Sequence, residues 1–360
     1  MKNLLSIIAV AAFGLFFNSC QKEELILAES TRMASTFGTS EIQGPDKPYQ
    51  GRFLSHARVL VSSNTTGIIS EYFYAADEPM SVASSYTVSH ADADGIVYDP
   101  MTDALYQVNR SNNQLVAFAE FGQAMNGGNL TPSAVSSSDF INGREAAFGK
   151  GRVVVAQDAS PDNGDQNAFV IYRTSPGQIQ YAATVNTDIN LWGIQVVDSD
   201  LWAVVDNSNM LAYFEKFTRL GSGFVNASST VMIEGIVRTH GLNYNQESDI
   251  MILTDVGDAT SATDGAIHVI TDFSSKWMEA VNGSGMISLE DQIRISGPMS
   301  LLGNPVDVDY NYQAEKIYVA ERANAGGQFL TFDLPTTSGD ATPVEAILTP
   351  GASAVTIGNE

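Results

Sequence analysis

The sequence predicts an all-β repeat protein, because three observations along the chain agree. A short phrase recurs six times, and its fullest copies occupy residues 95–109, 193–206 and 241–255. Each copy is an alternating apolar strand, a polar turn and a second apolar strand that ends in Asp or Asn. A third strand follows each of these copies, at residues 114–118, 210–214 and 266–270. Such self-similarity indicates units that bury their faces only against one another.

The period of the phrase predicts a β-propeller. The second strands end at Asn64, Asn109, Asp158, Asp206, Asp255 and Glu321. The first four intervals are about 45–50 residues, which suits a blade made of one four-stranded antiparallel sheet. We therefore expect six blades around a central channel, with seven blades as the alternative. From residue 52 onward we find no stretch with apolar residues three and four apart, so the repeat is not helical.

The individual units follow in order along the chain. Before Arg58 there is too little chain for the inner strand of the first unit, and residues 352–358 form a suitable strand to close the ring. The third unit departs from the others, because residues 149–151 form a Gly-Lys-Gly turn. The last interval, about 66 residues, predicts an insertion within residues 273–304, which include Trp277. Flat apolar residues of the second strands are expected to form the core between blades: Tyr106, Trp202, Met251 and Tyr318.

The phrase resembles the blade repeat of NHL-type and related six-bladed propellers, in which Gly-Ile-x-Val-Asp leads through a turn to Leu-Tyr-Val-x-Asp. The similarity extends over residues 52–349. The resemblance implies the fold, and not one function, since propellers of this kind include scaffolds, ligand-binding proteins and lactonases. It also implies a place for chemistry, because propeller lactonases hold Ca²⁺ or a similar ion at the channel rim.

The N-terminus predicts export as a lipoprotein. Lys2 precedes an apolar run at residues 4–17 that is too short to span a bilayer. The only cysteine, Cys20, then follows, as in bacterial lipoprotein signals that are cleaved before an acylated cysteine. Residues 21–24 resemble the tag that sends Bacteroidetes lipoproteins to the outside of the outer membrane. We expect a signal peptide at 1–19, a lipid-anchored flexible tether at 20–50 and a single propeller domain at 51–360, periplasmic or exposed on the cell surface.

Composition restricts the partners. The formal net charge is −23, with 18 Lys and Arg against 41 Asp and Glu, so nucleic acid is not an expected partner. An acidic surface favours cations and basic or neutral ligands, and we expect a protein, peptide or neutral oligosaccharide as partner. The expected contact with the membrane is the lipid on Cys20. A lone cysteine leaves no intramolecular disulfide, so stability depends on the core.

Five residues at the start of the inner strands are the candidate ligand-binding residues: Asp94, Glu145, Trp192, His240 and Asn304. They should encircle the channel mouth, and they differ from blade to blade, which a purely structural repeat does not require. Carboxylates, an imidazole, an indole and an amide are groups that small-ligand sites use. The Asp or Asn at the second-strand ends, by contrast, recurs in nearly every unit. That recurrence favours a structural role as a turn acceptor.

Two functions from different classes remain. The leading hypothesis is a cell-envelope lipoprotein whose propeller binds a ligand or partner protein at the channel mouth without catalysis or cofactor, with Tyr98 added to the contact residues. The alternative is a Ca²⁺-assisted lactonase-like hydrolase, in which Asp94, Glu145 and Asn304 hold the ion and His240 is the general base. A third hypothesis, a subunit of an envelope assembly, expects an exposed apolar patch on the insertion.

Overall fold

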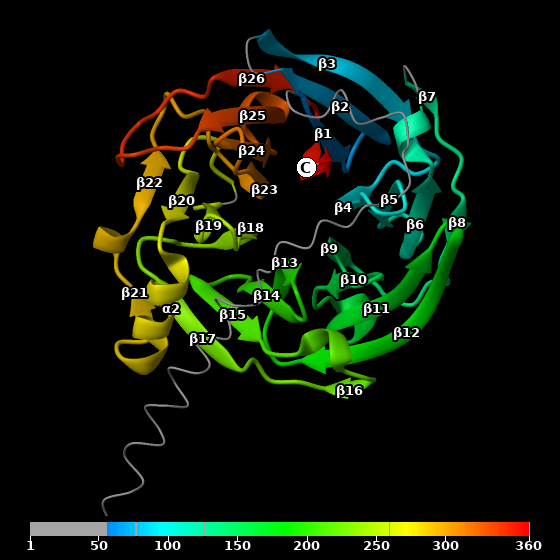
Figure 1. Cartoon of the computed structure of the whole chain (residues 1–360), viewed down its shortest axis with the longest axis horizontal. Helices are drawn as coiled ribbons and strands as arrows, with labels where there is room; N and C mark the ends of the chain where they lie inside the picture. The colour runs from blue at the N-terminus through cyan, green and yellow to red at the C-terminus, as the bar shows by residue number, and fades with distance from the viewer. Residues whose placement is uncertain (1–55, 76–77, 125–126, 259, 360) are drawn as a thin grey trace, which may run out of the picture. The chain divides into compact units, whose positions relative to one another are not determined.

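The computed structural model describes residues 56–75, 78–124, 127–258 and 260–359. Six β-sheets stand in a ring around a central channel, so these residues form a six-bladed β-propeller (Figure 1). The predicted fold class and number of blades are confirmed. The predicted signal peptide, Cys20 and the tether lie outside the described residues. Within the part of the chain that is described, no helix is long and apolar enough to cross a membrane.

Each blade is a sheet of four or five strands that follow one another outward from the channel. Blade 1 contains β27 (Ala352–Asn359), β1 (His56–Ser63), β2 (Ile68–Ala75), β3 (Glu78–Thr87) and β7 (Gly128–Asn129). Blade 2 contains β4 (Ala93–Asp99), β5 (Ala104–Asn109), β6 (Gln114–Ala119) and β8 (Ala134–Val135). Blade 3 contains β9 (Gly143–Gly149), β10 (Arg152–Gln157), β11 (Asn167–Ser175), β12 (Gln178–Thr187) and β16 (Gly223–Phe224).

The remaining three blades have the same order. Blade 4 contains β13 (Leu191–Val197), β14 (Asp200–Val205), β15 (Met210–Phe214), β17 (Ser229–Ile233) and β21 (Met286–Ile287). Blade 5 contains β18 (Thr239–Asn245), β19 (Ile250–Asp255), β20 (Ala266–Ile270) and β22 (Ile293–Ser296). Blade 6 contains β23 (Pro305–Asn311), β24 (Lys316–Glu321), β25 (Gln328–Asp333) and β26 (Glu345–Leu348). Short 3₁₀ helices interrupt the connections: η1 (Phe121–Gln123), η2 (Pro161–Asn163), η3 (Phe217–Arg219), η4 (Leu289–Asp291) and η5 (Asn324–Gly326).

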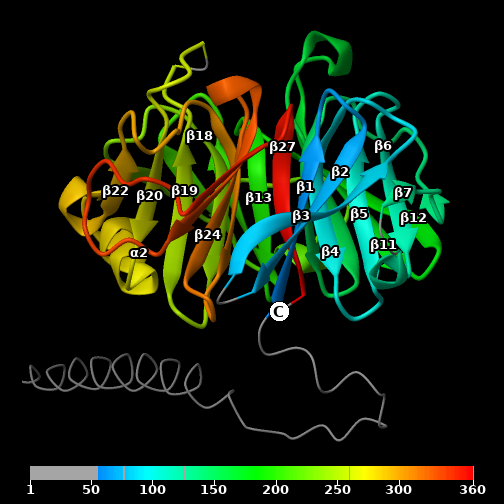
Figure 2. The same cartoon turned by 90° about the horizontal axis from the view of Figure 1, so that it is seen from above.

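The ring is closed by strands from the two ends of the described chain. β27 is the innermost strand of blade 1 and pairs antiparallel with β1, with Val61 opposite Val355. Figure 2 shows β27 lying beside β1. The prediction that residues 352–358 supply the missing inner strand is confirmed. Because one sheet contains both the first and the last described strands, the ring cannot open there without breaking a strand pair.

The core of the described residues consists of six apolar clusters, one between each pair of neighbouring blades. The predicted core residues all lie in such clusters. Tyr106 lies between blades 2 and 3, Trp202 and Met251 between blades 4 and 5, and Tyr318 between blades 6 and 1. The expectation for the inter-blade core is therefore confirmed. Each blade obtains its buried surface from its neighbours, as a repeat fold requires.

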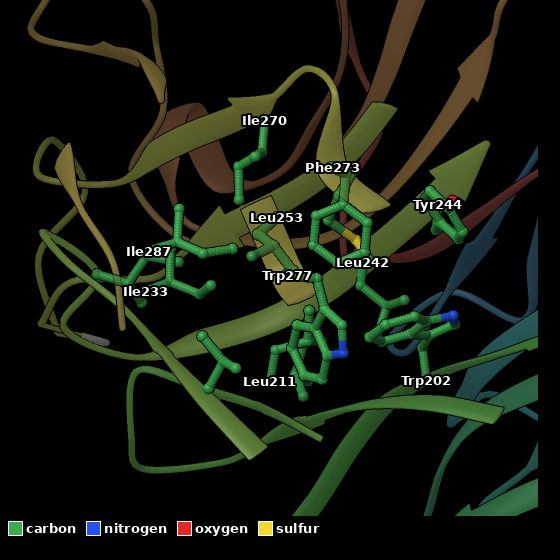
Figure 3. Packing of buried hydrophobic residues seen from close by; sticks show 14 of the residues in the cluster. Trp202, Leu211, Ile233, Leu242, Tyr244, Leu253, Ile270, Phe273, Trp277 and Ile287 are labelled. Carbon is green, nitrogen blue, oxygen red and sulfur yellow. The ribbon is translucent and has the colours of Figure 1, made fainter. Parts of the chain in front are cut away.

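The predicted insertion carries α2 (Phe273–Asn282), the one α-helix among the described residues. The expectation that no stretch has helical spacing is wrong here, because Phe273, Trp277 and Ala280 are four and three residues apart and all are buried. Trp277 packs edge-to-face on Trp202, with ring centroids 4.7 Å apart (Figure 3). Trp277 is only 5 % exposed, so it belongs to the core and not to an exposed apolar patch.

Candidate functional site at the channel mouth

Two rings of residues surround the end of the channel at which the inner strands begin. The members of each ring occupy the same position in their respective blades. The inner ring consists of the second residues of the inner strands: Ser353, Asp94, Arg144, Trp192, His240 and Val306. The outer ring consists of the residues that follow the second strands, where the backbone returns to the start of the inner strand: Asn64, Arg110, Asp158, Asp206, Val256 and Arg322. We call these twelve residues the mouth. No residue type recurs in the inner ring, so the mouth varies while the backbone repeats.

The observed register corrects part of the prediction. Asp94, Trp192 and His240 lie in the inner ring as expected, but Glu145 lies one residue further along β9 and Asn304 precedes β23. The inner strands carry a register shift after their first residue, as between Ala93 and Ile96 in β4. β9, β13 and β18 share this shift, so it does not set Glu145 apart. The difference lies in the sequence, because β9 carries Glu145 at the third strand position, where β4, β13 and β18 carry glycine.

The second-strand ends are also out of register with one another. Asp158 and Asp206 lie in the outer ring, one residue beyond the strand-terminal position of Asn109, Asp255 and Glu321. At that terminal position the predicted structural role is evident. Asp255 Oδ1 accepts hydrogen bonds from three backbone N–H groups, and the Glu321 carboxylate accepts from four. These carboxylates hold the turns in place.

Three arginines from blades 2, 3 and 6 converge on one buried carboxylate. Nη1 of Arg110 lies 3.6 Å from Asp94 Oδ2, Nη1 of Arg144 lies 3.8 Å from the same atom, and Nη2 of Arg322 lies 3.8 Å from Oδ1. The Asp94 side chain is 3 % exposed, and its Oδ2 has no hydrogen-bond partner among the described residues. Burial raises the pKa of Asp94, while the three arginines act to lower it. All three separations exceed hydrogen-bond length, so this carboxylate is surrounded by cations but not directly bonded to them.

The arginines keep donors that no described residue accepts. Nε of Arg110 and Nε of Arg322 are buried and have no hydrogen-bond partner among the described residues. Arg144 is better satisfied, because its Nε and Nη2 donate to Asp158 Oδ2 at 3.1 and 3.0 Å. Burial lowers the pKa of Arg322, which is therefore held in a poorly hydrated place. The three side chains are still partly exposed, so a ligand in solvent can reach them.

Trp192 is packed between two polar side chains. The imidazole of His240 stacks on it, with centroids 3.7 Å apart and planes 2° from parallel. The guanidinium carbon of Arg144 lies 4.0 Å from the indole centroid. With these neighbours and 7 % exposure, the indole presents no open face to a ligand. Trp192 therefore positions Arg144 and His240 through these two contacts.

His240 is held by a neighbouring carboxylate. Its Nε2 lies 3.2 Å from Asp206 Oδ1, and Arg238 donates to the same carboxylate at 2.7 and 3.1 Å. Burial lowers the pKa of His240 to about 4, so the imidazole is neutral at pH 7. Burial raises the pKa of Asp206, but the hydrogen bonds from His240 and Arg238 outweigh it and hold this pKa well below its usual range. A neutral imidazole that donates from Nε2 leaves a lone pair on Nδ1, which is buried without a partner among the described residues.

Inside the mouth, the six inner strands enclose a cavity of about 170 Å³. Glu145 and Asp307 line this cavity, one residue further along their strands than the inner ring. Burial, followed by the charge of Asp307, raises the pKa of Glu145 well above its usual value. Burial likewise raises the pKa of Asp307 well above its usual value, although its carboxylate accepts from the N–H groups of Val308 and Val355. Glu145 is thus a residue of the cavity wall.

Two other predicted contact residues take part in turns of the scaffold. The Asn304 backbone N–H donates to Glu321, and its carbonyl accepts from the Arg322 N–H, so this residue supports the turn that carries Arg322. The Tyr98 hydroxyl donates to Asp103 Oδ1 at 2.8 Å, at the turn that follows β4. Tyr98 therefore lies toward the opposite end of β4 from Asp94.

Asp94, one of the three predicted calcium ligands, has surroundings that do not favour a cation. Among the described residues, no group of three or more His, Cys, Asp or Glu side chains is placed to hold a metal ion. Asp94 faces Arg110, Arg144 and Arg322, which would repel a divalent cation at that carboxylate.

The arginines are the functional candidates that sequence reasoning missed. Arg110, Arg144, Arg238 and Arg322 are four of the chain's eleven arginines, and all lie in or beside the mouth. Two of them directly follow the second-strand ends at Asn109 and Glu321. Arginine is rare in this chain, so its presence at two equivalent positions of the repeat is the feature of the sequence that could have indicated this cluster.

Comparisons with known proteins identify the fold and no function. No protein-family model matches the chain, and no curated protein matches it. Among solved structures, a nidogen/laminin complex aligns with a TM-score of 0.57 at 12 % identity, over 84 % of this chain and 98 % of that chain. A putative 6-phosphogluconolactonase from Bacteroides fragilis aligns with a TM-score of 0.56 at 11 % identity, over 87 % of this chain and 99 % of that chain. A functionally unknown protein from Desulfotomaculum acetoxidans aligns with a TM-score of 0.53 at 10 % identity, over 84 % of this chain and 99 % of that chain.

Identities this low establish similarity of fold alone. The chain is a six-bladed β-propeller that shares its architecture with a chain of the nidogen/laminin complex and with the putative 6-phosphogluconolactonase.

Proposed function

We propose that this protein is a cell-envelope lipoprotein whose propeller binds a ligand or a partner protein at the channel mouth without catalysing a reaction. The observation that carries this proposal is the variety of the mouth. Six backbone-equivalent positions hold six different residue types, whereas the inter-blade core repeats its apolar character from blade to blade.

The buried polar atoms of the mouth support the same conclusion. Asp94 Oδ2, His240 Nδ1 and the Nε atoms of Arg110 and Arg322 lack hydrogen-bond partners among the described residues. An unsatisfied buried polar group costs about 1–3 kcal/mol, so a fold retains several of them together only where something else satisfies them. A bound ligand with complementary groups would do so.

A ligand screen tests this proposal. Differential scanning fluorimetry of the purified full-length chain against sugars, organic acids and peptides should give compounds that raise the melting temperature. Each hit is then measured on Arg144→Ala, which removes one guanidinium group from the mouth, and on Arg173→Ala, a control at an exposed residue near the end of β11. We expect the hits to lose affinity at Arg144→Ala only. Hits that bind both variants equally would place the ligand elsewhere.

The anchoring part of the proposal rests on the sequence around Cys20, outside the described residues. Its test is membrane fractionation of the native chain and of Cys20→Ser, with protease added to intact cells. The native chain should sediment with the outer membrane, and the variant should remain in the soluble fraction. An equal distribution of the two forms would reject the lipid anchor.

One observation favours the alternative, a lactonase-like hydrolase. The Asp206–His240 pair has the arrangement of a general base, since Asp206 accepts from Nε2 and Nδ1 remains open. The pair would orient a water molecule for attack on a bound ester. Hydrolysis of a panel of lactones by the native chain, compared with His240→Ala, tests this alternative. Turnover that His240→Ala abolishes would replace the binding proposal with the enzyme, and no turnover would leave binding as the function.

A further inference from the structure

We infer that the ligand of the mouth carries an oxyanion, and that Arg110, Arg144 and Arg322 hold this group. The inference rests on the proposed function, since it specifies the chemistry of the same site. It differs from what composition suggests, because the chain as a whole carries a net charge of −23 and favours basic or neutral ligands.

The distribution of charge is the first argument. Arginine is scarce in this chain, yet three guanidinium groups from separate blades lie within 3.8 Å of one carboxylate. Like charges brought together in a partly buried place repel one another, and burial adds a further cost that lowers the pKa of Arg322. A cluster of this kind is stabilised when an anion enters it, and guanidinium groups match the planar oxygens of carboxylate and the oxygens of phosphate or sulfate.

The balance of donors and acceptors is the second argument. The Asp158 carboxylate is already engaged, because Arg144 donates to it twice and Asn142 donates to it once. Asp92 lies 3.5 Å from Arg110 and is 44 % exposed, so solvent screens it. What remains is Asp94, which hydrogen-bonds none of the three arginines, together with the unpartnered Nε atoms of Arg110 and Arg322. The unpartnered donors of the arginines are these two Nε atoms, and acceptor oxygens of a ligand would satisfy them.

Two unpartnered hydrogen-bond acceptors of the mouth indicate which other groups the ligand carries. Asp94 Oδ2 and His240 Nδ1 are both buried and unpartnered among the described residues. Hydroxyl groups on the ligand would donate to them while the oxyanion accepts from the arginines. The geometry therefore points to a polyhydroxylated acid, such as a sugar that carries a carboxylate, sulfate or phosphate. Trp192 adds no stacking surface, because Arg144 and His240 already cover it.

Isothermal titration calorimetry of the full-length chain tests the inference with defined probes. The probes are glucuronate, inorganic phosphate and inorganic sulfate, with neutral glucose as control. We expect at least one anion to bind the native chain more tightly than glucose does. Its affinity for the double variant Arg110→Gln/Arg322→Gln should be at least tenfold lower, and its affinity for the Arg152→Gln control should equal that of the native chain. Affinity should also fall as salt is added. Tighter binding of glucuronate identifies a carboxylate ligand, and tighter binding of phosphate or sulfate identifies an ester of those acids.

Asp94→Asn gives a prediction with a definite sign. This change removes the carboxylate that all three arginines surround and retains a carbonyl acceptor, so anion affinity should rise. A ligand that is cationic at this point would instead bind more weakly. Circular dichroism and the melting temperature of the variant establish that the ring is intact.

The outcomes separate this inference from the proposed function. Binding of glucose or another neutral compound that Arg144→Ala weakens, with no binding of any anion, would overturn the inference and leave the binding function standing. Anion binding that Arg110→Gln/Arg322→Gln leaves unchanged would be adventitious and would also overturn it. Failure of every probe and every compound of the screen would overturn both.

Discussion

Glu145 provides a test of the electrostatics of the cavity. Its carboxyl is buried beside Asp307, and both effects raise its pKa well above the usual value of 4.5. The folded chain therefore keeps a proton on this group at pH values where the unfolded chain has lost it. A carboxyl group whose pKa is raised by folding makes the folded state less stable, relative to the unfolded state, as the pH rises. The stabilising contribution is complete below about pH 4.5 and is lost as pH rises through the folded pKa.

Glu145→Gln should remove this dependence. Glutamine is isosteric with the protonated acid and keeps the Oε1 that accepts from the Ala146 N–H at 2.8 Å. One proton difference gives a slope of about 1.4 kcal/mol of unfolding free energy per pH unit. The variant and the native chain should be equally stable near pH 4, and the variant should be more stable by about 1.4 kcal/mol for each unit above the unfolded pKa, until the folded pKa is reached. Glutamine also removes the repulsion between the Glu145 and Asp307 carboxylates, which further stabilises the variant relative to the native chain at high pH.

Urea denaturation between pH 4 and pH 8.5 measures this difference, because urea leaves the ionic strength unchanged. Glu247→Gln serves as the control, since Glu247 is exposed on the turn between β18 and β19. Parallel stability curves for the native chain and Glu145→Gln would refute the reasoning. So would a variant that is less stable at pH 8.

Three further predictions concern the scaffold. Gly241→Ala should destabilise the ring by roughly 1–3 kcal/mol, because its Cβ would lie 2.6 Å from Asp307 Cα, whereas Gly221→Ala, with open space around it, should be neutral in the same urea titration. Trp277→Ala should cost about 3–5 kcal/mol through the cavity it leaves beside Trp202, and equal melting temperatures in calorimetry would contradict the packing described for α2. Removal of residues 352–359 should abolish the cooperative thermal transition, and addition of the matching peptide should restore it. A truncated chain that melts like the native one would exclude β27 as the closing strand.

Most of the scaffold could be predicted from the sequence, because its information is local and repeated. Alternating apolar residues and polar turns define each strand pair, and the period gives the number of blades. Even the closing strand could be inferred, since the first unit lacked an inner strand before Arg58. Helix α2 was missed because it is ten residues long and has three buried positions, too few to stand out in a chain rich in strands.

The mouth could be predicted only in part, for two physical reasons. β9 carries Glu145 at the strand position where β4, β13 and β18 carry glycine, so the glycine that marks the start of the other inner strands gives no alignment there, and the sequence places Glu145 at the mouth although it lines the cavity. The charge environment also depends on contacts between blades. Asp94 meets Arg322, which is far away in the chain, and only closure of the ring brings them together. Composition predicts a negative charge for the protein as a whole, whereas three arginines lie together at the mouth.

For the proposed binding site, two successive layers of polar groups along the channel would decide where an anionic ligand is held. Directly inside the inner ring, neighbouring strands approach so closely that glycine occupies this level in β4, β13 and β18, as the contact of Gly241 with Asp307 illustrates. At the same level β9 and β23 carry Glu145 and Asp307, whose side chains line the cavity. In the proposed site, an oxyanion attracted to the arginines would meet carboxyl groups one residue deeper, and it would gain no favourable contact by moving further. This arrangement suits a recognition site that retains its ligand at the entrance, and it is poorly suited to a conduit for anions.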